Sequence, residues 1–244
     1  METLNTNEFQ ASVPQPETGS IISHAIEMFK GVVLYGALAM AIYFGASMIV
    51  QPLSGFDSQS LVEEMKNSGN SDPAVLWQTK GFINYSLLST VLSLALSPLF
   101  VGVIFIANKF NNKADIQIAD LFIGYRQNFG NIFLYSLIYT VAIYLGFAMC
   151  IVPGILIMPL FMLGYPILLF ENTDAITAIK KSFNIASANY GVILGVSLLS
   201  ILISAAGVLL CCVGLIATLP FMYVASYSAY CAFAGKPRQI VFKP

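Results

Sequence analysis

Few side chains in this sequence could carry out acid–base, nucleophilic or metal chemistry. The 244 residues include one histidine, His24, and four cysteines. A single histidine cannot form a histidine metal cluster, and the apolar segments contain no cysteine–histidine or serine–histidine pair that would activate a nucleophile. We therefore expect no metal, no cofactor and no enzymatic activity.

Three tyrosines form the main polar stripe in an apolar stretch near the C-terminus. Tyr223, Tyr227 and Tyr230 are spaced i, i+4, i+7, which places them on one face of a helix. They could line a polar groove for a lipid headgroup or a partner helix. They could instead make hydrogen bonds between helices, each contributing about 0.6 kcal/mol in a membrane, and form part of an aromatic belt.

Basic residues suggest a second kind of contact. Lys180 and Lys181 could bind anionic lipid headgroups, at about 1 kcal/mol for each basic residue. The basic tail with Lys236, Arg238 and Lys243 could do the same. Both groups also agree with the ordinary excess of positive charge on the cytoplasmic side of membrane proteins.

The composition places these residues in a membrane protein. The chain is 57% hydrophobic and 9% charged, with a mean hydropathy of +0.79, whereas soluble domains carry about 25% charged residues. This excludes a soluble enzyme and a disordered chain. The net charge of −1 offers no basic face to nucleic acid, so we expect no nucleic-acid partner.

Stretches without charge locate the membrane spans. Residues 31–56, 81–108, 127–170 and 182–235 contain no Asp, Glu, Lys or Arg. A helical span needs about 20 residues, so the first two stretches suit one span each and the last two suit a hairpin each. We predict an all-α polytopic bundle of six transmembrane helices, at residues 32–50, 82–107, 131–149, 154–170, 189–210 and 214–234.

The distribution of Lys and Arg predicts the orientation. With both termini in the cytoplasm of a bacterial inner membrane, only Lys66 and Lys80 lie outside. The inside residues are Lys30, Lys109, Lys113, Arg126, Lys180, Lys181, Lys236, Arg238 and Lys243. We predict a flexible tail at 1–19, a membrane domain at 20–235 with an outer loop at 51–81, and a basic tail at 236–244. In the loop, Ser60 to Glu63 resembles a capping box and Trp77 suits the outer interface.

The chain matches itself at an offset of 61 residues. The matched pairs are Phe122/Phe183, Asn128/Asn189, Gly130/Gly191, Ile132/Ile193, Ser136/Ser197, Leu137/Leu198, Gly146/Gly207, Cys150/Cys211, Val152/Val213, Ile155/Ile216 and Pro159/Pro220. Pro98 lies one further offset before Pro159, and we expect all three prolines to kink returning spans. This predicts three parallel units, at about 20–110, 115–172 and 174–235.

Each unit opens with an amphipathic stretch that suits a helix lying in the cytoplasmic interface. The apolar stripes are Ile22, Ala25, Ile26 and Phe29; then Ile118, Leu121, Phe122 and Tyr125; then Ile176, Ile179 and Phe183. Each predicted unit is therefore an interfacial helix, a span outward, a turn and a span back.

Small residues and cysteines leave alternatives open. Gly191 and Gly195 form one small-residue seam, and Ala37, Ala41 and Gly45 form another. Such seams allow close helix packing, inside the chain or against another subunit. Cys150 and Cys211 lie near the outer ends of spans and could form a disulfide or remain free thiols, whereas Cys231 is expected near the cytoplasm and reduced.

The third unit carries a set of residues with a family resemblance. The set is Pro159, Tyr165, Glu171, AIKKS at 178–182, and Asn189-Tyr190-Gly191. It resembles a broad bacterial family of six-span proteins that includes the YciC-like proteins and the membrane domain of glycerophosphoryl diester phosphodiesterases. The resemblance covers most of the chain, most clearly 119–235. It implies a membrane fold without catalysis, because those phosphodiesterases carry catalysis in a separate soluble domain that is absent here.

These observations predict a non-catalytic function. The spans contain no charged residue for a proton relay or a cation pathway. The first hypothesis is an accessory or scaffolding subunit that packs against other integral membrane proteins, with a homo-oligomer possible. The alternative is binding or passage of lipids or other apolar molecules in a cavity between the repeats.

Overall fold

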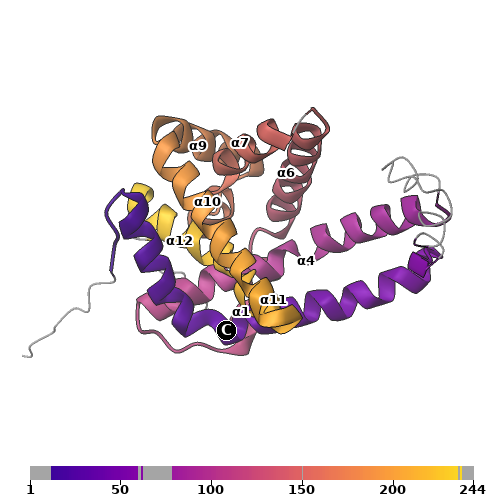
Figure 1. Ribbon diagram of the computed structural model, residues 1–244. Helices are drawn as coiled ribbons and strands as arrows, with labels where there is room; N and C mark the ends of the chain where they lie inside the picture. Colours follow the sequence, from indigo (N-terminus) through magenta and orange to yellow (C-terminus); the bar gives the residue numbers. More distant parts are fainter. Residues whose placement is uncertain (1–11, 60–61, 63–78, 150, 236, 238–244) are drawn as a thin grey trace, which may run out of the picture.

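The computed structural model describes residues 12–59, 62, 79–149, 151–235 and 237. Within these ranges the regular secondary structure is helical throughout, with no strand. Figure 1 shows α6, α7 and α9 grouped along one edge of the molecule, while the end of α1 and the start of α4 extend together away from the other helices.

The first helix pair consists of α1 (Thr18–Ser54) and α4 (Phe82–Asn111). The predicted interfacial helix and first span are one continuous helix rather than two, because no turn residue interrupts the hydrogen bonding between them. At about 1.5 Å per residue this 37-residue helix is about 56 Å long, well beyond a hydrocarbon core of about 30 Å. It changes direction along its length (Figure 1), so its first part can lie outside the core.

The second group contains η1 (Ile118–Phe122), α5 (Ile123–Arg126), α6 (Phe129–Met149), α7 (Ile151–Phe161) and α8 (Gly164–Glu171). The predicted amphipathic helix at 118–125 is wrong in detail, since it is a 3-10 helix followed by one α-helical turn. Leu121 is buried while Ile118 and Tyr125 are exposed. The reason is close packing on α4: Gly102 meets the Leu121 backbone and Gly124 meets the Pro98 backbone, with no room for a Cβ at either glycine.

The third group contains α9 (Ala175–Ala188), α10 (Tyr190–Ala206), η2 (Gly207–Leu210), α11 (Cys211–Thr218) and α12 (Phe221–Ala234). Helices α9 and α10 meet at 103°. Asp174 caps α9 by accepting a hydrogen bond from the Thr177 amide at 2.9 Å, and this bond lowers the pKa of Asp174. Small residues of α9 face the protein, whereas Ile176 and Phe183 are exposed.

By length and composition, five stretches in the described ranges can cross a membrane, or six if α9 and α10 count as one bent span. The five are Thr18–Ser54, Phe82–Asn111, Phe129–Met149, Ile151–Glu171 and Gly214–Ala234. The predicted all-helical architecture is therefore confirmed for the described residues, and these helices are long and apolar enough for several membrane spans. The number six remains a prediction.

The three prolines affect their helices differently. Pro98 lies within α4, which continues without a break. The helix after Pro159 stops at Phe161 and resumes at Gly164, and Pro220 lies between α11 and α12. Side-chain hydroxyls bond carbonyl groups near two of the prolines. Ser97 donates to the Leu94 carbonyl at 2.9 Å, Ser182 donates to the Leu160 carbonyl at 2.7 Å, and Tyr135 donates to the Phe161 carbonyl. Such bonds satisfy backbone groups that lipid cannot.

The segments that follow these prolines form the centre of the core. Residues 97–107 of α4, most of α8 and residues 224–231 of α12 are buried, and the three helices contact one another. This core supports the candidate site, because Phe100, Tyr165 and Tyr223 project from its three helices toward one cavity.

Candidate binding cavity

A cavity with two adjoining chambers lies between the helix groups. The chambers have volumes of about 130 and 300 Å³ and share Tyr139, Tyr165, Met222 and Tyr223 in their walls. The smaller chamber is completed by Tyr135, Met158, Phe161, Met162, Ser197, Ser200 and Ser226. The larger one is completed by Met40, Tyr43, Ser93, Leu94, Ser97, Phe100, Ser136, Thr140 and Leu219.

A chain of hydroxyl groups links three helices at the cavity wall. The Ser136 Oγ lies 2.7 Å from the Ser97 Oγ and 2.9 Å from the Tyr165 Oη. These residues belong to α6, α4 and α8, so the hydrogen bonds position the Tyr165 ring against the cavity. Ser136 and Ser197 are matched by the 61-residue offset, and both line the cavity. The internal match is therefore the feature of the sequence that indicates these two hydroxyls.

Two tyrosine hydroxyls in the cavity wall have no partner in the described part of the chain. The rings of Tyr139 and Tyr223 contact other rings, but their hydroxyls make no hydrogen bond to another described residue. In the described ranges, the Gln127 Oε1 is the one side-chain oxygen or nitrogen that is both fully buried and without a hydrogen bond. The two tyrosine hydroxyls are therefore not fully buried, and they remain accessible from the cavity. Both phenols are therefore available as hydrogen-bond donors to a bound molecule.

Aromatic rings shape the cavity around these donors. The rings of Phe100 and Tyr223 stack, with centroids 4.8 Å apart and planes at 9° to each other. The ring centroid of Tyr165 lies 6.2 Å from that of Tyr223. On the other wall, Tyr139 and Phe161 have centroids 5.5 Å apart. Among the described residues, no Asp, Glu, Lys, Arg or His lines either chamber. The site thus combines aromatic walls with uncharged hydrogen-bonding groups.

Comparison with known proteins places this architecture in a family. A model of an uncharacterised protein family, UPF0259, matches residues 31–227. The chain belongs to this family. No curated protein and no solved structure matches it. Every cavity-lining residue, from Met40 to Ser226, lies within the UPF0259 match.

The stripe of three tyrosines does not form a single groove in this UPF0259 protein. Tyr223 lines the cavity, whereas the Tyr227 hydroxyl is buried and bonded to Asn108 and Asn111 at 3.2 and 2.9 Å. The Tyr230 hydroxyl donates to Glu171 at 3.1 Å. Because α12 passes from the cavity into the core, residues on one helix face meet three different environments.

Tyr227 belongs to a buried polar cluster that sequence reasoning missed. His24 contacts the Ser228 Oγ through Nδ1 at 2.9 Å and the Ser12 Oγ through Nε2 at 3.0 Å. Asn111 bonds both Ser12 and Tyr227. The cluster joins the segment before α1 to α1, α4 and α12 across large sequence separations, and no local pattern in the sequence indicates it.

The two candidate lipid-binding lysines differ. Lys181 forms an ion pair with Glu171 at 2.7 Å, which occupies its charge. Lys180 is exposed on α9, on the same side as Ile176 and Phe183. Lys180 takes no part in this ion pair, so contact with lipid headgroups remains a prediction for Lys180.

The small-residue seams are not internal packing faces at most of their positions. A Cβ at Gly191 or Gly45 would meet no atom within 4 Å, and Ala41 is exposed. At Gly195 the nearest atoms belong to Thr18, at 3.0 Å from the Cβ position. The close helix contacts use other glycines, because α1 and α10 turn these seam positions outward.

Several predictions concern residues outside the described ranges. These are the Ser60 to Glu63 capping box, Trp77, Lys66, the first residues of the N-terminal tail, and the basic residues Lys236, Arg238 and Lys243. The side chains of Cys150, Cys211 and Cys212 are also outside them, so the disulfide alternative stays open. Cys231 is a buried free thiol.

Proposed function

We propose that this protein binds an uncharged, membrane-soluble molecule in the cavity and catalyses no reaction. The observation that carries this proposal is the pair of unpartnered phenol donors, Tyr139 and Tyr223, on a cavity of about 300 Å³. In a low-dielectric setting, a polar group without a hydrogen bond costs free energy. A ligand that brings an acceptor removes this cost, and the uncharged lining favours a neutral ligand.

The route into the cavity supports entry from the bilayer. The larger chamber is lined by Ser93 on α4 and Thr140 on α6. Close to these residues, Val91 of α4 and Val141 and Tyr144 of α6 are exposed. An apolar rim of this kind suits a ligand that arrives dissolved in the hydrocarbon core rather than from water.

Removing either phenol hydroxyl is expected to weaken ligand retention. Tyr139→Phe and Tyr223→Phe each delete one hydrogen bond worth about 0.5–1.5 kcal/mol, so the ligand recovered with the purified protein should fall by about two- to tenfold. The measurement is mass spectrometry of apolar molecules that copurify in mild detergent. Tyr85→Phe, near the start of α4 where the ring stacks on Phe56 with centroids 5.2 Å apart, is the control and should retain the wild-type amount. Equal recovery from all four proteins would contradict the proposal.

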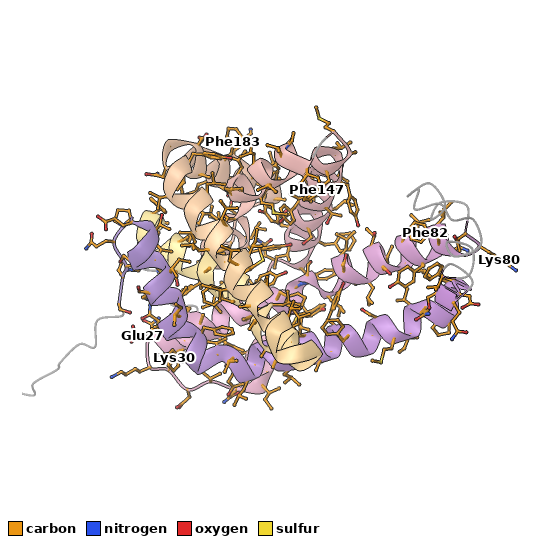
Figure 2. The ribbon with its side chains drawn as sticks, viewed as in Figure 1. Glu27, Lys30, Lys80, Phe82, Phe147 and Phe183 are labelled. Carbon is orange, nitrogen blue, oxygen red and sulfur yellow. The ribbon has the colours of Figure 1, made fainter. Side chains whose placement is uncertain are left out.

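We further propose six spans in three parallel repeats, with both termini in the cytoplasm of a bacterial inner membrane. Two hydrogen bonds support the repeat. The Tyr125 hydroxyl donates to the Ala95 carbonyl at 2.8 Å, and the Tyr190 hydroxyl donates to the Leu156 carbonyl at 2.9 Å. The two carbonyls are separated by the same 61-residue offset, and the two tyrosines by 65 residues. Figure 2 shows Lys80 at the far tip of the α1–α4 pair, remote from Glu27 and Lys30.

This orientation predicts opposite labelling of two exposed lysine positions. Cysteine at Lys80 should react with a membrane-impermeant maleimide added to intact spheroplasts, and cysteine at Lys113 should react only after permeabilisation. Both substitutions are made in a chain whose four native cysteines are replaced by serine or alanine. Labelling of both positions from the same side would overturn the proposed topology.

A role as an accessory subunit is the second candidate. The outward seam of Ala41 and Gly45 on α1 supports it, because small residues at an exposed helix face allow a second helix to approach closely. Gly45→Cys is expected to form a crosslinked species in cells, either a homodimer or a complex with another membrane protein. Leu34→Cys, a strongly exposed site on the same helix, is the control. Crosslinking no greater at Gly45 than at Leu34 would remove this candidate.

A further inference from the structure

We propose that the head of the bound molecule is a neutral ring with carbonyl acceptors, as in a quinone carrying an apolar tail. This inference rests on the proposed function and names its ligand class. Three properties of the cavity carry it: the kind of hydrogen-bonding group presented, the shape of the walls and the volume of the smaller chamber.

The two unpartnered phenol hydroxyls can each donate a hydrogen bond to an acceptor on the ligand. Tyr139 and Tyr223 are donors without a partner in the described ranges, whereas the neighbouring Tyr165 and Ser136 already bond each other. A carbonyl oxygen on the ligand pairs with a phenol donor without requiring a charge. A phosphate or carboxylate head would need a cationic partner, and the described part of the lining contains none.

The walls suit a flat ring better than a flexible acyl chain. Phe100 and Tyr223 already stack with planes 9° apart, and Tyr165 lies at 48° to Tyr223. Aromatic rings favour offset-stacked and edge-to-face contacts with other rings. Met158, Met162 and Met222 add flexible thioethers that adapt to a ring edge.

The two chambers match a head and a tail. The smaller chamber, at about 130 Å³, is close to the roughly 150 Å³ cavity that holds one benzene molecule. The larger chamber adjoins it and lies next to the exposed apolar rim on α4 and α6. A ring can therefore occupy the smaller chamber while its hydrocarbon tail passes through the larger one toward the bilayer.

The test compares three probes in phosphatidylcholine nanodiscs that contain the full chain. The probes are decylubiquinone, decylbenzene, which has the same tail and no carbonyl, and dioleoylglycerol, which has acyl ester carbonyls and no ring. The amount of each probe retained above that of empty nanodiscs is measured by chromatography of an extract. We expect about one decylubiquinone per protein, with affinity reduced about two- to tenfold in Tyr223→Phe and in Tyr139→Phe. Affinity should be unchanged in Tyr85→Phe, because the Tyr85 ring stacks on Phe56 and lines neither chamber.

The possible results separate this inference from the proposed function. Retention of dioleoylglycerol but not of decylubiquinone would overturn the ring assignment and leave binding of a neutral molecule intact. Equal retention of decylbenzene and decylubiquinone, with no effect of the phenylalanine variants, would overturn recognition of carbonyl groups. Retention of no probe, together with no copurified molecule in the native protein, would overturn both proposals.

Discussion

Gly102→Val is expected to lower the free energy of unfolding by about 3 kcal/mol. A Cβ at Gly102 would overlap the carbonyl oxygen of Leu121 and approach the Leu121 Cα to 2.7 Å. The obstacle is backbone, so no rotamer change relieves it. The segment 118–126 would have to move away from α4, which also carries Pro98 against Gly124.

Thermal unfolding in detergent, followed by circular dichroism, measures this effect. Gly130→Val is the matched control, because a Cβ at this exposed position of α6 meets no atom within 4 Å. The control should melt near the wild-type temperature, while Gly102→Val should melt well below it. Similar melting temperatures for the two variants would show that the segment 118–126 does not pack on α4 as described.

Asn111→Ala is expected to cost about 2 kcal/mol of stability and to release the segment before α1. The Asn111 side chain is 5% exposed. Its Nδ2 donates to the Tyr227 Oη and to the Ser12 carbonyl, both at 2.9 Å, and its Oδ1 accepts from the Ser12 amide at 3.1 Å. Alanine would remove all three bonds: the buried Tyr227 hydroxyl would be left with its 3.2 Å bond to the Asn108 Oδ1, and the Ser12 amide and carbonyl would lose their link to α4.

Hydrogen exchange at residues 12–17 distinguishes this effect from a general loss of stability. Asn112→Ala provides the control, since the Asn112 Nδ2 bonds only within its own helix, to the Asn108 carbonyl at 2.7 Å and to the Asn108 Oδ1 at 3.0 Å. Exchange at 12–17 should become faster in Asn111→Ala and stay near wild type in Asn112→Ala. Equal exchange in both variants would contradict the role given to the cluster.

The membrane class of this protein could be predicted from the sequence because it depends on local composition. Absence of charge over stretches such as 127–170 is sufficient to indicate lipid, since each buried charge costs free energy wherever the neighbouring helices lie. Helix-breaking residues could also be predicted locally, since Pro159 and Pro220 lie close to the helix breaks in the structure. Prediction was weaker at 118–125, where close backbone packing on Gly102 replaced a regular amphipathic helix.

The candidate site could be predicted only in part. Tyr223 was recognised as a polar residue on an apolar helix, and it lines the cavity. Tyr139 carries the other unpartnered hydroxyl of the cavity wall. It lies in a stretch where tyrosines are common, and its spacing from them does not set it apart. Tyr227 and Tyr230 share the helix face of Tyr223 but bond Asn111 and Glu171 instead, because a helix face of three turns can pass through more than one environment.

The sequence by itself determined that this chain is a multi-pass helical membrane protein with long stretches free of charge, because hydropathy acts on each segment separately. Only the tertiary structure decided which hydroxyls remain free to bind a ligand and which lysine is paired. Contacts such as His24 with Ser228 and Ser97 with Ser136 join residues far apart in the chain. These contacts form only when the helices pack together, and a pattern within one segment does not predict that packing.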